Sequence, residues 1–284
     1  MQSKTIQLSK VTSRKNAFLD HSSDDDVVLE EPLSVILSSY TDALSIETTT
    51  VLTTMRTPGH DIELVKGWLN TQTFIKPEEI ASMSQKENSN LLTISANVKY
   101  RLDKNKLTRL SAVSSSCGIC NDTEIDKLVN QSKVNSIVKL QVEAQMIHKL
   151  TESIFDKASL FRCTGGSHSS ALFTIHNGQL TSQLLSIRED VGRHNALDKL
   201  IGSFEFDSKE IRSSALLLSG RVSADLMQKV VCAGIPVVLA VGAPSSLAIE
   251  IAEALGIILI GFIRKDSFNI YSGNKQISIN YSSA

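Results

Sequence analysis

Residues 214–263 read SALLLSGRVSADLMQKVVCAGIPVVLAVGAPSSLAIEIAEALGIILIGFI. Three apolar runs in this stretch, at 214–218, 235–241 and 257–263, alternate with two helical segments, at 224–233 and 246–255. Strands that are apolar along their whole length and lie between helices are typical of a sheet covered on both faces. The stretch therefore predicts an α/β domain with a mainly buried sheet flanked by helices.

The residues before this stretch predict further elements of the same domain. Apolar residues recur at helical spacing over 137–155, which predicts a long helix. Two β-rich runs, 171–176 and 179–187, flank Asn177-Gly178, a strong signal for a hairpin turn. A helix is expected next, with its apolar side chains facing inward, namely Leu197, Leu200, Ile201 and Phe204.

The N-terminal half has a different sequence pattern, with polar and β-rich segments. Residues 1–22 are polar and predict a frayed tail, whereas 27–38 and 46–55 are β-rich and predict paired strands. Pro58-Gly59 breaks the chain before an amphipathic helix, and residues 92–100 alternate as a half-buried strand.

We therefore expect three parts. They are a polar tail over 1–22, a small α+β domain over 23–135, and a larger α/β domain over 136–284.

Composition excludes some classes of partner. The chain has 284 residues, a formal net charge of −1 and 42% hydrophobic residues. Neither sign of charge dominates, so nothing predicts nucleic acid or an anionic membrane as partner. The N-terminus lacks the apolar core of a signal peptide, and the longest apolar runs are too short to cross a bilayer. We expect a soluble, cytoplasmic protein.

Two thiols lie three positions apart in a polar loop that begins Ser114-Ser115-Ser116 and continues Cys117-Gly118-Ile119-Cys120. Exposure and nearby positive groups make a cysteine reactive, and Gly118 lets another molecule approach the sulfur closely. In a reducing compartment such a pair is catalytic or metal-binding more often than structural. Thiol chemistry, half of a zinc site and two incidental surface thiols all remain open on the spacing alone.

Three segments follow strands of the predicted sheet, where open α/β sheets bind ligands. They are Ser219-Gly220-Arg221, residues 242–246 and residues 261–267. The first two lead into helix starts, whose free N–H groups favour phosphate, and Arg221 and Arg264 add planar, charged donors. Each segment taken singly can also be a plain turn. Together with Arg162, Arg188 and Arg193 they are compatible with a phosphorylated ligand.

Two more segments have a chemical character. The first contains Gly165, Gly166 and His168 ahead of a strand, as in a loop that contacts phosphate or a pterin. In the second, residues 188–195, Asp190 can accept two N–H bonds from a guanine edge, and His194 can give or take a proton near neutral pH. An ion-pair cluster that caps a helix explains the second segment equally well.

At these residues the chain resembles a known family. The run REDVGRHNALDK at 188–199 is similar to the signature of the formate dehydrogenase accessory sulfurtransferase family, FdhD. The segments TGGSH at 164–168, CGIC at 117–120, SGRVS at 219–223 and GFIR at 261–264 match the same family in consistent order. The resemblance spans residues 27–273.

The resemblance implies a function. Members accept sulfur from a cysteine desulfurase as a cysteine persulfide and pass it to the molybdenum cofactor, bis-molybdopterin guanine dinucleotide, for the formate dehydrogenase apoprotein. It also implies a cytidine-deaminase-like fold for the larger domain and a homodimer. By position, Cys117 is the persulfide-bearing residue and Cys120 its partner. The implied cofactor-binding segment consists of Phe262, Ile263, Arg264, Lys265, Asp266 and Ser267.

The sequence departs from the family pattern at three places and adds one thiol. Asn121 stands where a glycine commonly follows the second cysteine, Thr71-Gln72-Thr73 replaces a Thr-Glu-Gly, and Ser38-Ser39-Tyr40 replaces an Asn-Gly turn. Cys163 is an extra thiol beside the paired glycines. These departures bear on loop geometry and substrate preference.

Three other functions can be compared with the sequence. A zinc hydrolase of deaminase type needs a His-x-Glu and a Pro-Cys-x-x-Cys, but the chain has no His-x-Glu, and Ser116 precedes Cys117. A thioredoxin-like motif normally follows a strand and opens a helix, whereas this pair lies in a polar loop. The third rival is a chaperone that binds the molybdenum cofactor for formate dehydrogenase without moving sulfur. The sequence also predicts no intrinsic metal.

Overall fold

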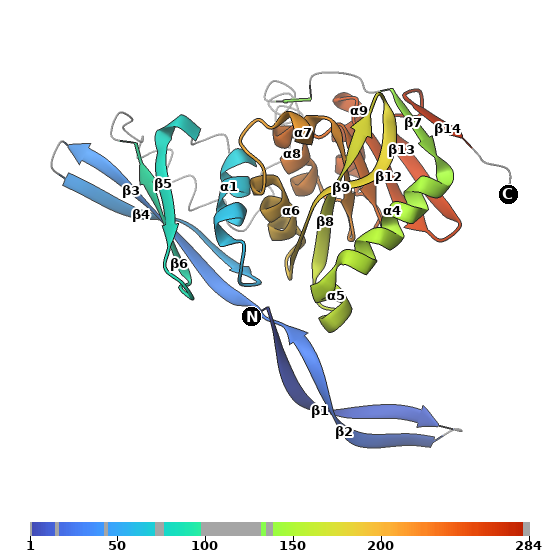
Figure 1. Ribbon diagram of the computed structural model, residues 1–284, viewed down its shortest axis with the longest axis horizontal. Helices are drawn as coiled ribbons and strands as arrows, with labels where there is room; N and C mark the ends of the chain where they lie inside the picture. The colour runs from blue at the N-terminus through green and yellow to red at the C-terminus, as the bar shows by residue number, and fades with distance from the viewer. Residues whose placement is uncertain are drawn as a thin grey trace.

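The structure is a computed structural model that describes residues 2–14, 17–42, 45–71, 77–97, 132–134 and 139–280. Side chains are described in these ranges except at 11–21 and 40–45. The described strands form a two-stranded hairpin, a four-stranded sheet and an eight-stranded sheet (Figure 1). The fold is thus mixed α/β, as the sequence predicts, whereas the cytidine-deaminase-like assignment remains a prediction.

The eight-stranded sheet has the order β13-β12-β11-β10-β8-β9-β7-β14. Its centre is formed by β10 (Ser214–Leu218), β11 (Val237–Ala240) and β12 (Ile258–Arg264), which run parallel. Helices α8 (Ala224–Ala233) and α9 (Ser246–Ala254) connect them. The strand–helix alternation read from residues 214–263 is therefore confirmed, with ends shifted by no more than two residues.

Further strands complete this sheet on both sides. On one side, β13 (Ser267–Ser272) pairs antiparallel with β12. On the other side lie β8 (His168–His176) and β9 (Gln179–Asp190), each antiparallel to the strand before it. They are followed by β7 (Leu140–Glu143) and β14 (Ile277–Asn280), which pair in parallel. Asn177 and Gly178 both have positive φ, as the expected hairpin turn requires.

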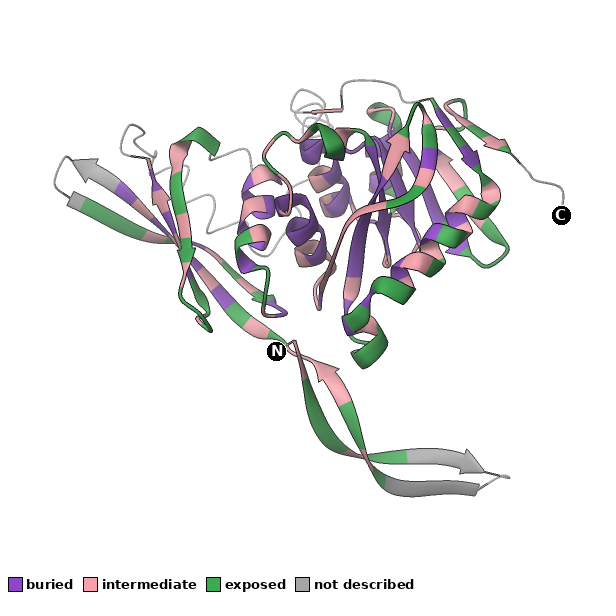
Figure 2. Ribbon diagram, in the orientation of Figure 1, coloured by how far each residue is buried: buried purple, intermediate pink, exposed green. Residues whose placement is uncertain are grey.

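Helices cover both faces of the large sheet, so its strands are buried (Figure 2). One core cluster joins one face to α6 (Arg193–Gly202), α8 and α9, with α7 (Lys209–Arg212) beside it. A second cluster joins the other face to α4 (Ala144–Lys157). The predicted sheet between two helical layers is confirmed.

The expected helix over 137–155 is partly wrong. Residues Leu140–Glu143 form β7, and α4 begins only at Ala144. The side chains of β7 alternate between buried and exposed, which is the period of a strand. Gln141 N also donates to Gly178 O (2.7 Å), so this short strand pairs beside the β8–β9 hairpin rather than beginning a helix.

The four-stranded sheet has the order β4-β3-β6-β5. Its strands are β3 (Glu31–Asp42), β4 (Ser45–Arg56), β5 (Ile80–Gln85) and β6 (Leu91–Ala96), preceded at β5 by the short turn η1 (Pro77–Glu79). One face packs on α1 (Asp61–Thr71), with Trp68 only 8% exposed. The paired strands, the break at Pro58-Gly59 and the amphipathic helix are confirmed.

The expected frayed tail over 1–22 is wrong. β1 (Ser3–Arg14) and β2 (Ala17–Val28) pair over their whole length and project from the body of the molecule (Figure 1). Polar side chains bond across the ladder, with Thr5 Oγ1 donating to Asp26 Oδ1 at 2.6 Å and Gln7 Nε2 to Ser22 Oγ at 2.9 Å. Because these strands are polar, they lack the apolar pattern by which a strand is recognised, although their backbones still pair by hydrogen bonds.

The two sheets are joined by α1 and α6, which lie in very close contact. A Cβ built on Gly67 of α1 would lie 1.8 Å from Asp198 O, and one on Gly202 of α6 would lie 1.8 Å from Glu63 O. Only glycine permits this approach. The expected domain boundary at residue 135 lies outside the described residues.

Candidate functional site

The turns after the three central strands meet at one edge of the large sheet. Gly242 N, after β11, donates to Gly220 O, after β10, at 3.0 Å, and Phe262 N of β12 donates to Gly242 O at 3.0 Å. The start of β8 and the start of α6 border the same place. We call this region the carboxyl edge. It brings together the three segments that the sequence predicts at strand ends.

Close backbone contacts shape the carboxyl edge. A Cβ on Gly242 would lie 2.5 Å from Arg221 N, and one on Gly220 would lie 3.2 Å from His168 Nδ1. Real Cβ atoms do not approach backbone so closely, so glycine is required at Gly242. The tight turns leave the side chains of Arg221 and His168 at the rim of this edge.

Two histidines lie at the carboxyl edge in their neutral form. Burial, and then the charge of Arg193, lowers the pKa of His194 to about 4, although Asp225 opposes this with Oδ2 4.0 Å from His194 Nε2. Burial and Arg193 also lower the pKa of His168. At neutral pH each ring therefore offers one acceptor and one donor nitrogen.

Three arginines, Arg193, Arg221 and Arg264, form no ion pair with a carboxylate among the residues that the structure describes. Other arginines are paired, Arg56 with Asp61, Arg188 with Glu63 and Arg212 with Asp207. Unpaired guanidinium groups at strand ends are suited to an anionic ligand such as a phosphate.

Several buried polar atoms without partners lie at the same edge. Within the described ranges, eight buried side-chain atoms have no hydrogen-bond partner, and four of them are here, namely Ser169 Oγ, Arg193 Nε, His194 Nε2 and Ser223 Oγ. Ser223 is the N-cap residue of α8, yet its side chain does not cap the helix. Because buried polar groups are normally hydrogen-bonded, these atoms are candidates for ligand contacts. Sequence reasoning missed Ser169 and Ser223, although a serine directly before a helix is a recognisable signal.

Phe262 and Arg264 form a stacked pair at the end of β12. Phe262 has a φ of 54° and is 44% exposed, at a break in the β12–β13 register. The Arg264 guanidinium lies 4.0 Å from the centre of the Phe262 ring, and its Nη1 donates to Val241 O at 2.7 Å. The pair presents a flat, positively charged surface on which an aromatic base can stack.

The other residues of the expected cofactor segment differ in their exposure to solvent. Ile263 is 2% exposed and belongs to the core, so it does not fit as a ligand contact. Lys265, Asp266 and Ser267 are exposed in the turn between β12 and β13. The correction follows from strand alternation, because neighbouring residues of β12 point to opposite faces.

Gly165 and Gly166 end a short helix, α5 (Ser159–Thr164). Gly165 has a φ of 63° and donates through its N–H to Phe161 O at 2.7 Å, as expected of a C-terminal glycine. A Cβ on Gly166 would lie 2.9 Å from Val28 Cγ1, at the base of the β1–β2 hairpin. Helix termination accounts for Gly165 and close packing against Val28 for Gly166, and a ligand contact there stays a prediction.

Asp190 does not fit as a contact to guanine. It is fully buried, and Lys199 Nζ lies 2.7 Å from Asp190 Oδ2. Thr57 N donates to Oδ2 at 3.0 Å, while Gly192 N donates to Oδ1 at 2.8 Å. Both carboxylate oxygens are thus bonded inside the protein. Asp190 instead fixes the turn that carries Arg193, and no sequence signal identifies its partner Thr57.

The other charged residues of the 188–199 signature are also structural. Arg188 Nη2 donates to Glu63 Oε1 of α1 at 2.9 Å, and Lys229 bonds both oxygens of the buried Asp198 at 2.9 Å. Glu189 accepts from the backbone N–H groups of Leu160 and Phe161 at the start of α5. The ion-pair part of the alternative interpretation therefore fits most of the signature, whereas the N-cap of α6 is Gly192 and neither Asp190 nor Asn195 caps the helix. Arg193 and His194 are left facing the carboxyl edge.

The paired thiols Cys117 and Cys120, and Asn121 beside them, lie outside the described residues. Cys163 is exposed on α5 and donates to Asp26 Oδ2 at 3.3 Å, and this hydrogen bond raises the pKa of its thiol. Cys232 is buried in α8. No three His, Cys, Asp or Glu residues within the described ranges are grouped so that they could hold a metal ion.

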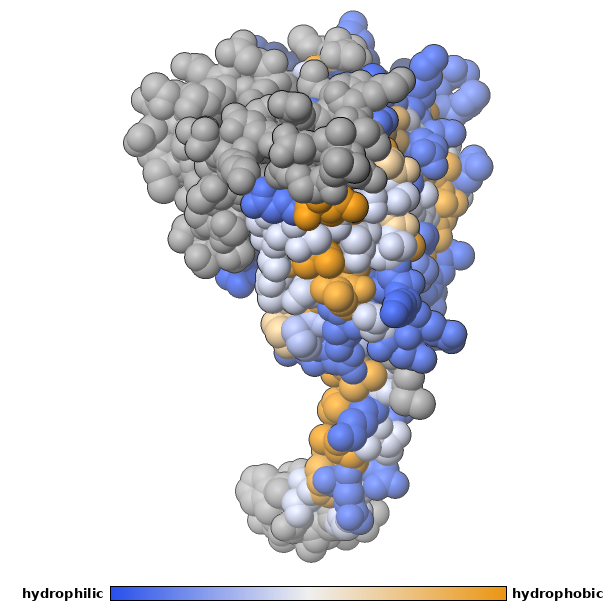
Figure 3. Space-filling model, turned by 90° about the vertical axis from the view of Figure 1, so that its left-hand side faces the viewer, coloured by the Kyte–Doolittle hydropathy of each residue, from blue (hydrophilic) through white to orange (hydrophobic). Residues whose placement is uncertain are grey.

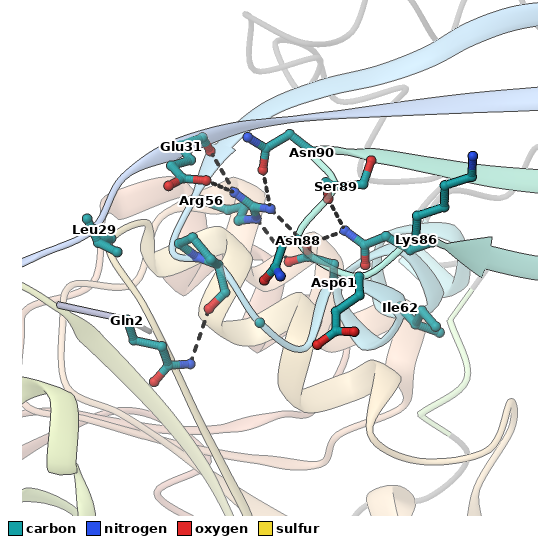
Figure 4. Close-up of a pocket in the computed structure, with 14 residues that line it drawn as sticks. Gln2, Leu29, Glu31, Arg56, Asp61, Ile62, Lys86, Asn88, Ser89 and Asn90 are labelled. Carbon is teal, nitrogen blue, oxygen red and sulfur yellow. Dashed lines mark hydrogen bonds and ion pairs between the residues drawn. The ribbon is translucent and has the colours of Figure 1, made fainter.

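A cavity of about 590 Å³ lies away from the carboxyl edge, between the Pro58-Gly59 turn and the turn that joins β5 to β6. Figure 4 shows Arg56 at its centre, bonded to Asp61, Asn90 and Glu31. Because the protein itself satisfies this guanidinium, Arg56 is not free to bind an anionic ligand.

Comparisons with known proteins agree on one family. The family model described as "FdhD/NarQ family" matches residues 38–278. A relative from Corynebacterium efficiens, named sulfur carrier protein FdhD, is 36% identical over 94% of this chain and 96% of its own length. Another of that name, from Sulfolobus acidocaldarius, is 36% identical over 98% of this chain and 100% of its own length.

A solved structure has the same fold. It is described as a formate dehydrogenase accessory protein from Desulfotalea psychrophila, and it matches with a TM-score of 0.68 over 96% of this chain and 99% of that one. Its sequence identity is 21%, so the likeness concerns the fold. Within the described ranges, no helix is both long and apolar enough to span a membrane.

Proposed function

This chain belongs to the FdhD/NarQ family, and from that membership we propose that it is a sulfur carrier that serves formate dehydrogenase. In this proposal a cysteine desulfurase loads one sulfur onto Cys117 as a persulfide, and Cys120 assists by thiol exchange. The sulfur then passes at the sulfide level to the molybdenum cofactor, bis-molybdopterin guanine dinucleotide, which is the substrate, while Cys117 and Cys120 supply the two electrons by forming a disulfide. The protein acts as a sulfurtransferase and as a homodimer.

The observation that carries the proposal is the set of unpaired cationic groups at the carboxyl edge. The substrate has phosphates and guanine rings. Arg193 and Arg221 offer charged donors for the phosphates, with Ser223 at the start of α8. The Phe262–Arg264 pair offers a stacking surface for a base. A substrate held in this way is oriented for transfer, which makes the step effectively unimolecular.

The neutral histidines suit the same ligand. His194 has a nitrogen without a partner among the described residues, and burial keeps the ring uncharged at neutral pH. A neutral ring can accept a hydrogen bond from a thiol, or donate one to a phosphate oxygen. His168, beside Gly220, extends this set across the edge.

A binding experiment tests the ligand site. Calorimetry with GDP should show weaker binding for Arg264→Ala and Arg221→Ala, each by roughly tenfold, the loss of about 1.4 kcal/mol. Arg212→Ala is the matched control, because Arg212 ends α7 directly before the start of β10, at the opposite edge of the large sheet. Unchanged affinity in the first two variants would reject this site.

A non-catalytic chaperone for the molybdenum cofactor is the second candidate, because the described groups at the carboxyl edge are suited to binding alone. The two functions differ at Cys117. If the protein carries sulfur, Cys117→Ala abolishes maturation of formate dehydrogenase but leaves GDP binding intact. If it is a chaperone, maturation survives in the same variant.

A further inference from the structure

The four-stranded sheet has one face packed on α1 and an opposite face that points away from the rest of the described molecule. We call the latter the neutral face. Its middle row consists of Thr50, Ile36, Thr93 and Ser84, on β4, β3, β6 and β5 respectively. All four are exposed or half-buried. This face is therefore accessible and continuous across four strands.

The neutral face carries no charged side chain among its described residues. Beyond the middle row, the outward positions are serine, threonine, proline, methionine, isoleucine or leucine. Ile46 is 60% exposed and Leu91 45% exposed, toward opposite ends. Solvent-facing surfaces usually mix charges of both signs at about a quarter to a third of positions. A sheet face without charges resembles the core of a protein interface.

Figure 3 shows the molecule from the side toward which this face points. Neutral and apolar residues, white and orange, occupy the middle of the view, and hydrophilic residues, blue, lie mainly to their right and below. The separation of the two kinds of surface agrees with the residues assigned from the strand register.

We propose that the neutral face binds the same face of a second copy of this chain, sheet against sheet about a two-fold axis. A two-fold axis places each residue near it against its own copy, so any charge there would meet a like charge. A neutral face avoids this repulsion and the cost of removing charges from water. Hydroxyl groups can donate to and accept from their own copies.

The area is adequate for such a contact. At about 4.8 Å between strands and ~3.3 Å per residue, the described parts of the four strands cover roughly 500 Å² in projection. The corrugated surface of a sheet is larger than its projection, which brings the accessible area near the ~800 Å² that each partner contributes to a standard interface. Two sheets packed face to face at about 10 Å would let Ile36 and Leu91 interdigitate with their copies.

The neutral face also adjoins the candidate site. Met55, at its end on β4, accepts a hydrogen bond through its carbonyl from Asn195 Nδ2 at 2.7 Å. Asn195 lies two residues after Arg193 in α6. The end of the interface with a second copy would therefore lie close to the carboxyl edge of each chain. The inference specifies a surface for the homodimer in the proposed function, but its test does not depend on sulfur transfer.

The test is the mass of the full-length protein in solution. Light scattering after size-exclusion chromatography at micromolar concentration should give twice the 31.0 kDa of one chain for the wild type. Thr93→Lys, at the centre of the neutral face, should raise the dimer dissociation constant by about 100-fold and elute as a monomer, because two ammonium groups would meet. Gln183→Lys, on exposed β9, is the matched control and should remain a dimer.

Charge reversal keeps the test independent of folding defects. Mixing the Thr93→Lys and Thr93→Glu variants should restore a dimer, and both should keep the far-ultraviolet circular dichroism of the wild type. A monomeric wild type would overturn the proposal and assign the face to another occupant, such as the chain's own remaining residues or a different protein. A dimer that persists in Thr93→Lys would overturn it as well.

Discussion

The buried pair of Lys199 and Asp190 gives the sharpest test of how the site is held. Both side chains are fully buried, and Lys199 Nζ lies 2.7 Å from Asp190 Oδ2 and donates to Thr57 O at 2.7 Å. In Lys199→Met the lysine is replaced by an apolar side chain of similar length, and the Asp190 carboxylate is left buried without its counter-charge. Breaking a buried pair in this way costs about 3–5 kcal/mol. That is a large share of the ~5–15 kcal/mol by which domains are stable.

The assay is equilibrium unfolding in urea, followed by circular dichroism. Lys199→Met should lower the free energy of unfolding by about 3–5 kcal/mol. Lys209→Met, at an exposed lysine of α7, should change it by less than ~0.5 kcal/mol. The double variant Asp190→Asn with Lys199→Met removes both charges and should recover at least ~1 kcal/mol relative to Lys199→Met. A single variant within 1 kcal/mol of the wild type, the upper bound for an exposed pair, would refute the reasoning.

Three further outcomes follow from the described contacts. Gly67→Ala places a methyl group against Asp198 O and should lower the free energy of unfolding by ~1–3 kcal/mol. Lys66→Ala, one residue earlier on α1, should lower it by less than ~1 kcal/mol. Equal effects would contradict the close packing of α1 on α6. His194 should titrate near pH 4 in nuclear magnetic resonance spectra, because burial and the charge of Arg193 lower its pKa, and titration at the ordinary 6.5 would disprove its buried setting. Since the unfolded chain binds this proton at higher pH, the contribution of His194 to stability is complete above pH 6.5 and is lost as pH falls toward 4. Burial opposes ionisation of Glu63, but Arg188 lowers the pKa of this carboxyl overall. The contribution of the ion pair to the free energy of unfolding is therefore complete above pH 4.5 and is lost as pH falls below it. Glu63→Gln should flatten that part of the pH–stability curve, and an unchanged curve would count against the pair.

The parallel centre of the large sheet was predictable because its signals are local. Apolar runs between helical repeats define β10, β11 and β12, and Asn177-Gly178 marks its own hairpin turn. The β1–β2 hairpin was missed because its polar side chains lack the apolar signal of a strand. The strand β7 was missed because its partner β14 lies far along the chain. β7 is four residues long, and the helical periodicity of α4 directly after it masked the change of period.

The location of the candidate site could be predicted from the sequence, but the contacts of its individual residues could not. Strand ends that run into helix starts pointed to the carboxyl edge, and Arg193, His194 and Arg221 lie there. The internal bonds of Asp190 were not predictable, because one partner, Lys199, lies on the following helix and the other, Thr57, lies 133 residues away. Sequence spacing alone cannot distinguish a carboxylate that holds the fold from one that meets a ligand.

The central claim is that one labile sulfur travels on Cys117. The direct measurement is the intact mass of the protein after incubation with cysteine and a cysteine desulfurase, followed by peptide mapping without reductant. The account predicts that the wild type gains the mass of one sulfur atom on the peptide that contains Cys117, and that added molybdenum cofactor removes it. An unmodified wild type, or the same gain in Cys117→Ala, would contradict it.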